Sequence, residues 1–211
     1  MQIRDFKSII DNYEIIFFDA FGVIKNYKGL VPGIEKTFAY LEATNKEYYI
    51  VTNDASRSPQ QLAESYHNKG LMAITHDRII SSGMLAKEYL DLKVPQGIVA
   101  YLGTPDSAHY IESSGLHTMP ISMIDDTNAD EVSALVFLDD EGFDWFNDLN
   151  KCVNILRKRN IPAIVANTDR AYPLNLHDVS IAIGGLANMI ESIVGKKFIR
   201  FGKPDSQMFM F

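Results

Sequence analysis

Cysteine is almost absent from this sequence, and basic residues are outnumbered by acidic ones. The 211 residues include a single cysteine, Cys152, so the sequence excludes a disulfide within the chain. So little cysteine is typical of a reducing compartment, and we predict a cytoplasmic protein. Lysine and arginine total 20 against 27 aspartates and glutamates, which gives a formal net charge of −7. Because no basic block interrupts this acidic chain, we expect no nucleic-acid partner.

Long apolar runs are also missing. No stretch approaches the roughly 18 uninterrupted apolar residues of a membrane-spanning helix, so we expect no membrane partner. The first residues, MQIRDFKSIIDNYE, mix charges among apolar positions, which is unlike a secretory signal peptide. Hydrophobic residues make up 46% of the chain, which is enough for one large core or for a core with a smaller second lobe.

Short apolar runs alternate with amphipathic helical patterns along the whole chain. Strands are expected at 14–20, 47–53, 78–83, 97–103, 134–140, 161–167 and 198–203. Helices are expected at 32–45, 58–71, 84–92, 106–115, 144–160 and 186–196. This alternation predicts an α/β protein with a Rossmann-like, mainly parallel sheet. We place a core domain at 1–84 and 179–211 and an inserted α/β lobe at 85–178.

Polar residues stand where two of the expected strands end. Asp19 follows IIFF, and Thr52 and Asn53 follow YYIV. Ligands of open α/β sheets bind beyond the carboxyl ends of the strands, so Asp19 is a candidate nucleophile or metal ligand. Thr52 and Asn53 are candidate donors to an anion. Gly22 would let backbone N–H groups turn toward an oxyanion, and Lys203 would supply a cation.

These segments together resemble a known family. Asp19-Ala20-Phe21-Gly22-Val23, VTNDASRSP (51–59) and FGKPD (201–205) are similar in order and spacing to motifs one, two and three of the haloacid dehalogenase (HAD) superfamily. The longer phrase VTNDASRSPQQLAESYHNKGL is most similar to class IIA, the NagD-like sugar phosphatases, which insert an α/β cap domain between motifs two and three. The resemblance extends over nearly the whole chain, including IPAIVANTDRAYP (161–173) and IGGLANMIESIVGKKFIRFGKPD (183–205).

The resemblance implies a magnesium-dependent phosphatase of a small phosphorylated metabolite, with a sugar phosphate as the expected substrate. Asp19 would attack phosphorus and form an aspartyl-phosphate, which divides one displacement into two. Thr52 would hold a phosphoryl oxygen, and Lys203 would neutralise charge and orient Asp19. Magnesium would bridge Asp19 and the phosphoryl group, with the backbone carbonyl of Phe21 as a further ligand.

The same resemblance suggests which residues would bind the substrate. The residues expected there are Gly22, Asn53 and Asp54 in the core, and Asn167 and Asp169 in the cap. The cap would set specificity by closing over Asp19, and a homodimer through the cap is the expected assembly.

The sequence departs from the family pattern at Phe21. Most phosphatases of the family carry an aspartate two residues after the nucleophile, where it protonates the leaving group and later activates water. Phenylalanine has no proton to transfer, although a carbonyl ligand does not depend on the side chain. Three explanations stay open: a substrate with a good leaving group, a weak phosphatase, or another proton donor. The candidate donors are Asp54, Asp139, Asp140 and Asp169.

A second departure is that no fourth motif follows FGKPD, although that motif supplies further magnesium carboxylates in the family. PDSQMFMF (204–211) is expected to begin a helix whose apolar residues, Met208, Phe209 and Phe211, have little to cover them. We therefore expect this sequence to be the N-terminal part of a longer chain.

Two other functions remain open on the sequence. FDAFG also resembles the FDAYG of metal-free 2-haloacid dehalogenases, in which an aspartate attacks carbon, but those enzymes insert their cap directly after motif one. Here the 28 residues from Lys25 through Thr52 leave room for one helix and one strand only. A non-catalytic protein that kept the fold is the other alternative, since both departures remove catalytic groups.

Overall fold

The computed structural model describes residues 6–210, which form two compact units. The first unit runs to Thr52 and resumes from Pro59 to Ile80, and the second comprises Asn53–Ser58 and Ser81 onward. The first five residues of the predicted core domain, and Phe211 of the predicted apolar face, lie outside the described residues.

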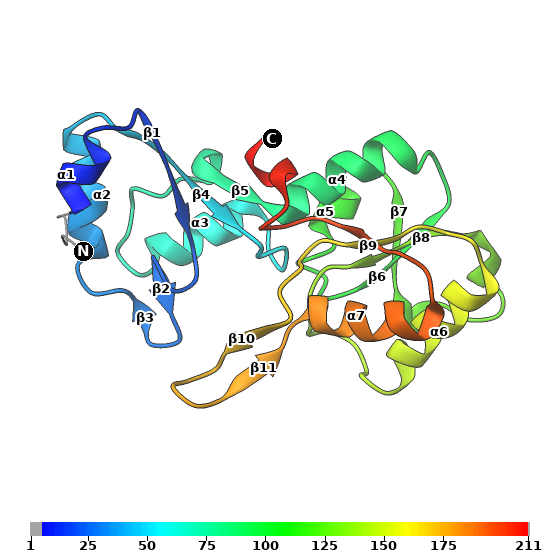
Figure 1. The fold of residues 1–211 in the computed structure, drawn as a ribbon. Coiled ribbons are helices and arrows are strands. Elements are labelled where there is room, and N and C mark those ends of the chain that lie inside the picture. Colours follow the sequence, from blue (N-terminus) through cyan, green and yellow to red (C-terminus); the bar gives the residue numbers. More distant parts are fainter. Residues whose placement is uncertain (1–5, 211) are drawn as a thin grey trace. The chain divides into compact units, whose positions relative to one another are not determined.

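The first unit is built on a three-stranded sheet with the order β1-β4-β5 (Figure 1). β1 is Ile15–Asp19, β4 is Glu47–Thr52 and β5 is Ile79–Ser81. The remaining elements are α1 (Phe6–Ile10), the hairpin β2 (Lys25–Asn26) and β3 (Gly29–Leu30), α2 (Ile34–Ala43), α3 (Pro59–His67) and the 3₁₀ helix η1 (His76–Arg78). β1 and β4 are parallel, and α2 is the helix that connects them, because a parallel pair needs a crossover connection.

An aromatic cluster forms the centre of the first unit. Phe38 of α2 lies between Phe18 of β1 and Tyr48 of β4, with ring centroids 5.2 and 5.1 Å apart. All three side chains are buried, together with Ile34 and Leu41 on the same face of α2. This cluster fixes β1 and β4 side by side, and therefore fixes the residues at their carboxyl ends.

The second unit contains a five-stranded parallel sheet with the order β12-β9-β8-β6-β7. Its strands are β6 (Ile98–Leu102), β7 (His117–Pro120), β8 (Val132–Phe137), β9 (Ala163–Val165) and β12 (Ile199–Arg200). Its helices are α4 (Ser82–Lys93), α5 (His109–Glu112), α6 (Asn147–Lys158) and α7 (Ile183–Val194). The unit also contains an antiparallel hairpin, formed by β10 (Ala171–Pro173) and β11 (Val179–Ile181). Its 3₁₀ helices are η2 (Ile121–Met123), η3 (Ala129–Glu131) and η4 (Ser206–Phe209).

Helices cover both faces of this sheet. Figure 1 shows α6 and α7 on one face and α4 and α5 on the other. Every residue of β6 is buried, which is the pattern of a strand covered on both sides. Ile98, Ala100 and Leu102 join the core under α6 and α7, while Val99 and Tyr101 alternate with them. The prediction of an α/β fold with a mainly parallel sheet is confirmed.

The predicted domain boundaries differ from the two compact units. The sequence predicts that residues 179–211 belong to the core domain. The described part of this segment instead belongs to the second unit, where β12 pairs with β9 and α7 packs in the core of the same sheet. The division into a core at 1–84 and 179–211 and a cap at 85–178 stays a prediction.

Several local predictions need correction. The helix expected at 106–115 is regular only in α5, His109–Glu112. The sequence does not predict the two short hairpins or β7, because strands of two to four residues have little periodicity. Met208, expected on an uncovered face, is buried, whereas Phe209 is 56% exposed. Within residues 6–210 the structure has no helix with the length and apolarity that a membrane crossing requires.

Candidate active site

Two predicted catalytic residues lie at one edge of the first unit's sheet. Asp19 is the last residue of β1 and aligns with Val51 of β4, so Thr52, the last residue of β4, lies one step further along. Asp19 is exposed, and its Oδ1 accepts a hydrogen bond from the Ala20 N–H at 2.7 Å. Thr52 is buried, with an exposed fraction of 7%. A carboxylate and a hydroxyl at neighbouring strand ends suit a nucleophile beside an anion donor.

The loop after Asp19 is a tight turn. Gly22 has φ = 89°, a left-handed conformation that favours glycine, and its N–H donates to the Lys25 carbonyl at 2.7 Å. Its amide therefore closes the turn, and a role of Gly22 in substrate binding stays a prediction. The neighbouring Phe21 is 39% exposed, so its side chain is not part of the packed core.

Three further predicted residues meet within the second unit. The Asn53 side chain hydrogen-bonds the backbone of Lys203 and the carboxylate of Asp169. Asn167 lies beside them, where its Oδ1 accepts from the Asp169 N–H at 2.9 Å. Asp54 closes its own turn, since its Oδ1 accepts from the N–H and the hydroxyl of Ser56.

Sequence reasoning missed the side chains that hold this arrangement in place. Tyr110 donates to the carbonyl of Arg57 at 2.7 Å, and Ser81 donates to the carbonyl of Asp54 at 2.6 Å. Tyr110 is buried, which raises the pKa of its phenol well above the usual range. The sequence carried no clear signal for these residues, because a polar side chain by itself does not say what it contacts.

Two carboxylates considered as proton donors follow β8 in the second unit. Partial burial, together with the neighbouring charge of Asp140, raises the pKa of Asp139 from 3.8 to about 6. Burial also raises the pKa of Asp140, although the Tyr172 hydroxyl, which donates to its Oδ2 at 3.0 Å, opposes this rise. Asp139 is thus the carboxyl group here that most readily carries a proton near neutral pH.

We expect Asp139→Asn to stabilise the protein at neutral pH and not in acid. A carboxyl group whose pKa is raised on folding contributes stability below its unfolded value of 3.8, and this contribution is lost as the pH rises through about 6. The full shift would be worth roughly 3 kcal/mol, which partial solvent exposure reduces to about 1–2 kcal/mol. Urea denaturation at about pH 8 and about pH 4 measures this difference. Equal gains at both pH values, or a matching gain in the exposed control Asp126→Asn, would contradict it.

The donor set for a magnesium ion is only partly present in the first unit. The Asp19 carboxylate and the Phe21 carbonyl are hard oxygen ligands of the kind that Mg²⁺ prefers, and Mg²⁺ usually keeps several water ligands. Among residues 6–210, no group of three histidine, cysteine, aspartate or glutamate side chains is arranged to hold a metal ion. Asp19 and Phe21 therefore fit magnesium by donor type and supply part of its coordination.

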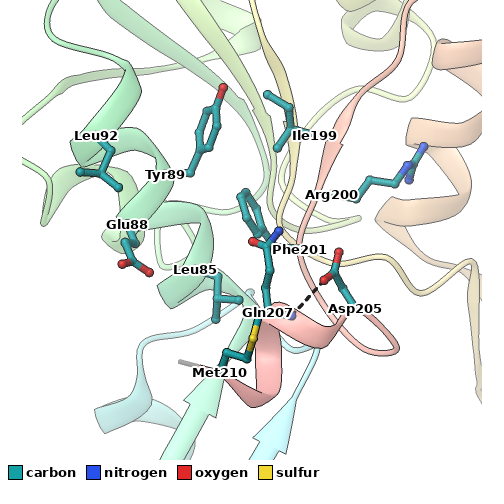
Figure 2. Close-up of a pocket in the computed structure, with 10 residues that line it drawn as sticks. All are labelled: Leu85, Glu88, Tyr89, Leu92, Ile199, Arg200, Phe201, Asp205, Gln207 and Met210. Carbon is teal, nitrogen blue, oxygen red and sulfur yellow. Dashed lines mark hydrogen bonds between the residues drawn. The ribbon is translucent and has the colours of Figure 1, made fainter.

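A pocket of about 730 Å³ lies elsewhere in the second unit (Figure 2). Residues of α4 line one side of it, and Phe201, Asp205 and η4 line the other. Tyr89 and Phe201 approach with ring centroids 5.8 Å apart. Asp205 accepts from the Gln207 N–H at 3.0 Å, which is the contact drawn in Figure 2. All of the predicted site residues lie within residues 6–210, and none of them lines this pocket. Lys203 is near it in sequence, because Phe201 and Asp205 both line the pocket.

A family model and a solved structure both match this chain to haloacid dehalogenase-like hydrolases. The family model of the haloacid dehalogenase-like hydrolases matches residues 16–117. A crystal structure from Cytophaga hutchinsonii, described as a possible sugar phosphatase of the HAD superfamily, is 69% identical, with a TM-score of 0.96 over 100% of this chain and 74% of that one.

Two more distant relatives carry names of phosphatases. Phosphoglycolate phosphatase 2 of Arabidopsis thaliana is 35% identical over 90 residues, which is 43% of this chain and 30% of that protein. The glycerol phosphate phosphatase of Mycobacterium tuberculosis, crystallised with magnesium, shares the fold at 20% identity, with a TM-score of 0.76 over 96% of this chain and 58% of that one. The chain thus spans about a third to three quarters of the proteins it matches.

Proposed function

Because the chain belongs to the haloacid dehalogenase superfamily, we propose that it is a magnesium-dependent phosphatase of a small phosphomonoester. The observation that carries the proposal is the position of Asp19 at the carboxyl end of β1, one residue in register from Thr52 on the adjacent strand. Buried aromatic side chains hold these two strands together, so the carboxylate and the hydroxyl have a fixed separation.

The reaction divides into two displacements. A carboxylate oxygen of Asp19 attacks phosphorus, the bond from phosphorus to the ester oxygen breaks, and the leaving alkoxide takes up a proton. Water then attacks the aspartyl-phosphate, which releases inorganic phosphate and restores Asp19. Thr52 would donate to a phosphoryl oxygen during both steps, and the Lys203 ammonium would offset its negative charge.

Magnesium would be held in part by the Asp19 carboxylate and the Phe21 carbonyl. When bound, it would neutralise charge on the phosphoryl oxygens and reduce their repulsion of the attacking carboxylate.

A sugar phosphate is the proposed substrate class, since the 69% identical protein of Cytophaga hutchinsonii is described as a possible sugar phosphatase. Substrate contacts by Gly22, Asn53, Asp54, Asn167 and Asp169 and a homodimer through the predicted cap are parts of the same proposal. So is a cytoplasmic location, which the single buried cysteine favours.

The proposal is tested by hydrolysis of p-nitrophenyl phosphate, whose good leaving group barely needs the acid that Phe21 lacks. We expect turnover with Mg²⁺, loss of turnover with EDTA, and recovery when Mg²⁺ is added in excess. Release of chloride from a 2-haloacid without metal would instead support the dehalogenase alternative. An absence of turnover on any phosphomonoester would support a non-catalytic role for this chain.

A further inference from the structure

The backbone of Lys203 is held by a side chain from a distant part of the sequence. The Lys203 N–H donates to Asn53 Oδ1 at 2.6 Å, and Asn53 Nδ2 donates to the Lys203 carbonyl at 3.2 Å. The carboxamide thus pairs with both polar groups of one residue's backbone, across 150 positions in the sequence. Two hydrogen bonds to one residue fix its orientation as well as its position.

The loop after β9 strengthens this pairing. Thr168 Oγ1 donates to the Lys203 carbonyl at 3.0 Å, and Asp169 Oδ1 accepts from Asn53 Nδ2 at 2.9 Å. Both hydrogens of the Asn53 amide are therefore directed at protein acceptors. Asn53 is only 6% exposed, so the loss of these partners would leave buried polar groups unsatisfied.

Close packing at Gly202 shows how tightly the three segments meet. Gly202 has φ = 129°, and a β-carbon on it would come within 2.9 Å of Asn53 Oδ1 and 3.0 Å of Thr168 Oγ1. Such distances are shorter than ordinary contacts, so the residue before Lys203 must lack a side chain. The glycine of FGKP therefore allows the segment before Lys203 to pack closely against Asn53 and Thr168.

From this geometry we propose that Asn53, Thr168 and Asp169 form a clamp that positions Lys203 for catalysis. Asn53 is then a positioning residue, and this role replaces the substrate contact proposed for it above: its carboxamide hydrogen-bonds Lys203 and Asp169 and orients the lysine that offsets phosphoryl charge. The inference rests on the proposed phosphatase function.

The first test measures the clamp without using activity. Amide hydrogen exchange of residues 201–205 is compared among the unsubstituted chain, Asn53→Ala and the exposed control Asn160→Asp. We expect Asn53→Ala to raise exchange at Lys203 by roughly 10-fold or more while β8 and α7 keep their protection. Unchanged exchange at Lys203 would overturn the clamp.

The second test separates positioning from substrate binding. Hydrolysis of p-nitrophenyl phosphate with Mg²⁺ is expected to show kcat lowered by roughly 10²-fold in Asn53→Ala, with KM changed by less than about 3-fold, because a displaced catalytic group affects the reaction more than binding. A higher KM with unchanged kcat would assign Asn53 to the substrate and overturn the inference, as would kinetics equal to those of Asn160→Asp.

Thr168 provides a milder variant should Asn53→Ala fold poorly. Thr168→Val removes only the hydroxyl and should lower kcat, whereas Thr168→Ser retains the hydroxyl and should restore it. Equal kcat values for these two variants would contradict the clamp. An inactive parent chain would count against the proposed function itself, and hydrogen exchange at Lys203 would still show whether Asn53 holds that backbone.

Discussion

Asp19→Asn is expected to abolish the hydrolysis of p-nitrophenyl phosphate, with a fall in kcat of at least roughly 10³-fold, as for the removal of other enzymatic nucleophiles. The amide has nearly the shape of the carboxylate but is a far weaker nucleophile. Its Oδ1 can still accept from the Ala20 N–H, so the end of β1 should keep its conformation. A magnesium-dependent assay of purified protein, with thermal denaturation alongside, measures both activity and folding.

Asp126→Asn is the matched control for this substitution. It removes the same charge from an exposed loop of the second unit and should leave kcat and KM unchanged. Mass spectrometry adds a second readout, since brief incubation with substrate should leave a phosphoryl group on the parent chain and none on Asp19→Asn. Full activity in Asp19→Asn, or a phosphoryl group on another residue, would disprove the proposed nucleophile.

Phe21→Asp is expected to accelerate the hydrolysis of alkyl phosphomonoesters by roughly 10²-fold or more, within the usual range of general acid catalysis. An alkoxide is a poor leaving group that needs a proton, whereas p-nitrophenolate leaves without one. The gain should therefore be large for glycerol or sugar phosphates and small for p-nitrophenyl phosphate. Phe21 is partly exposed, so the substitution creates no cavity in the core.

Phe21→Asn separates proton transfer from the loss of the aromatic ring. Asparagine has the size of aspartate but no carboxyl proton, so it should not produce the gain. If both variants accelerate the hydrolysis of alkyl esters equally, the gain comes from removing the Phe21 ring, which hindered access of the substrate, and not from adding a general acid. If neither does, a different group protonates the leaving oxygen, and Asp139, with its pKa of about 6, is the next residue to substitute.

The longer elements could be predicted from the sequence because their residues alternate with a clear period. Buried strands such as β6 are continuous apolar runs, and α2 places Ile34, Phe38 and Leu41 on one face. The hairpin of β10 and β11 could not be predicted, because three-residue strands that are mostly exposed carry almost no pattern. Boundaries also shifted where the tertiary environment extended a helix, as in α7, which begins at Ile183 instead of the expected 186.

The sequence by itself determined that Asp19 and Thr52 stand at the carboxyl ends of apolar strands, where open α/β sheets bind their ligands. That the two strands are parallel neighbours, so that both residues share one edge, was decided by the strand pairing in the structure. Only the tertiary structure decided how Asn53 is used. Its hydrogen-bond partners are the backbone of a residue 150 positions away and a carboxylate on a third segment, and sequence spacing carries no information about such contacts. The raised pKa of Asp139 likewise depends on burial, which a chain acquires only when its distant segments pack together.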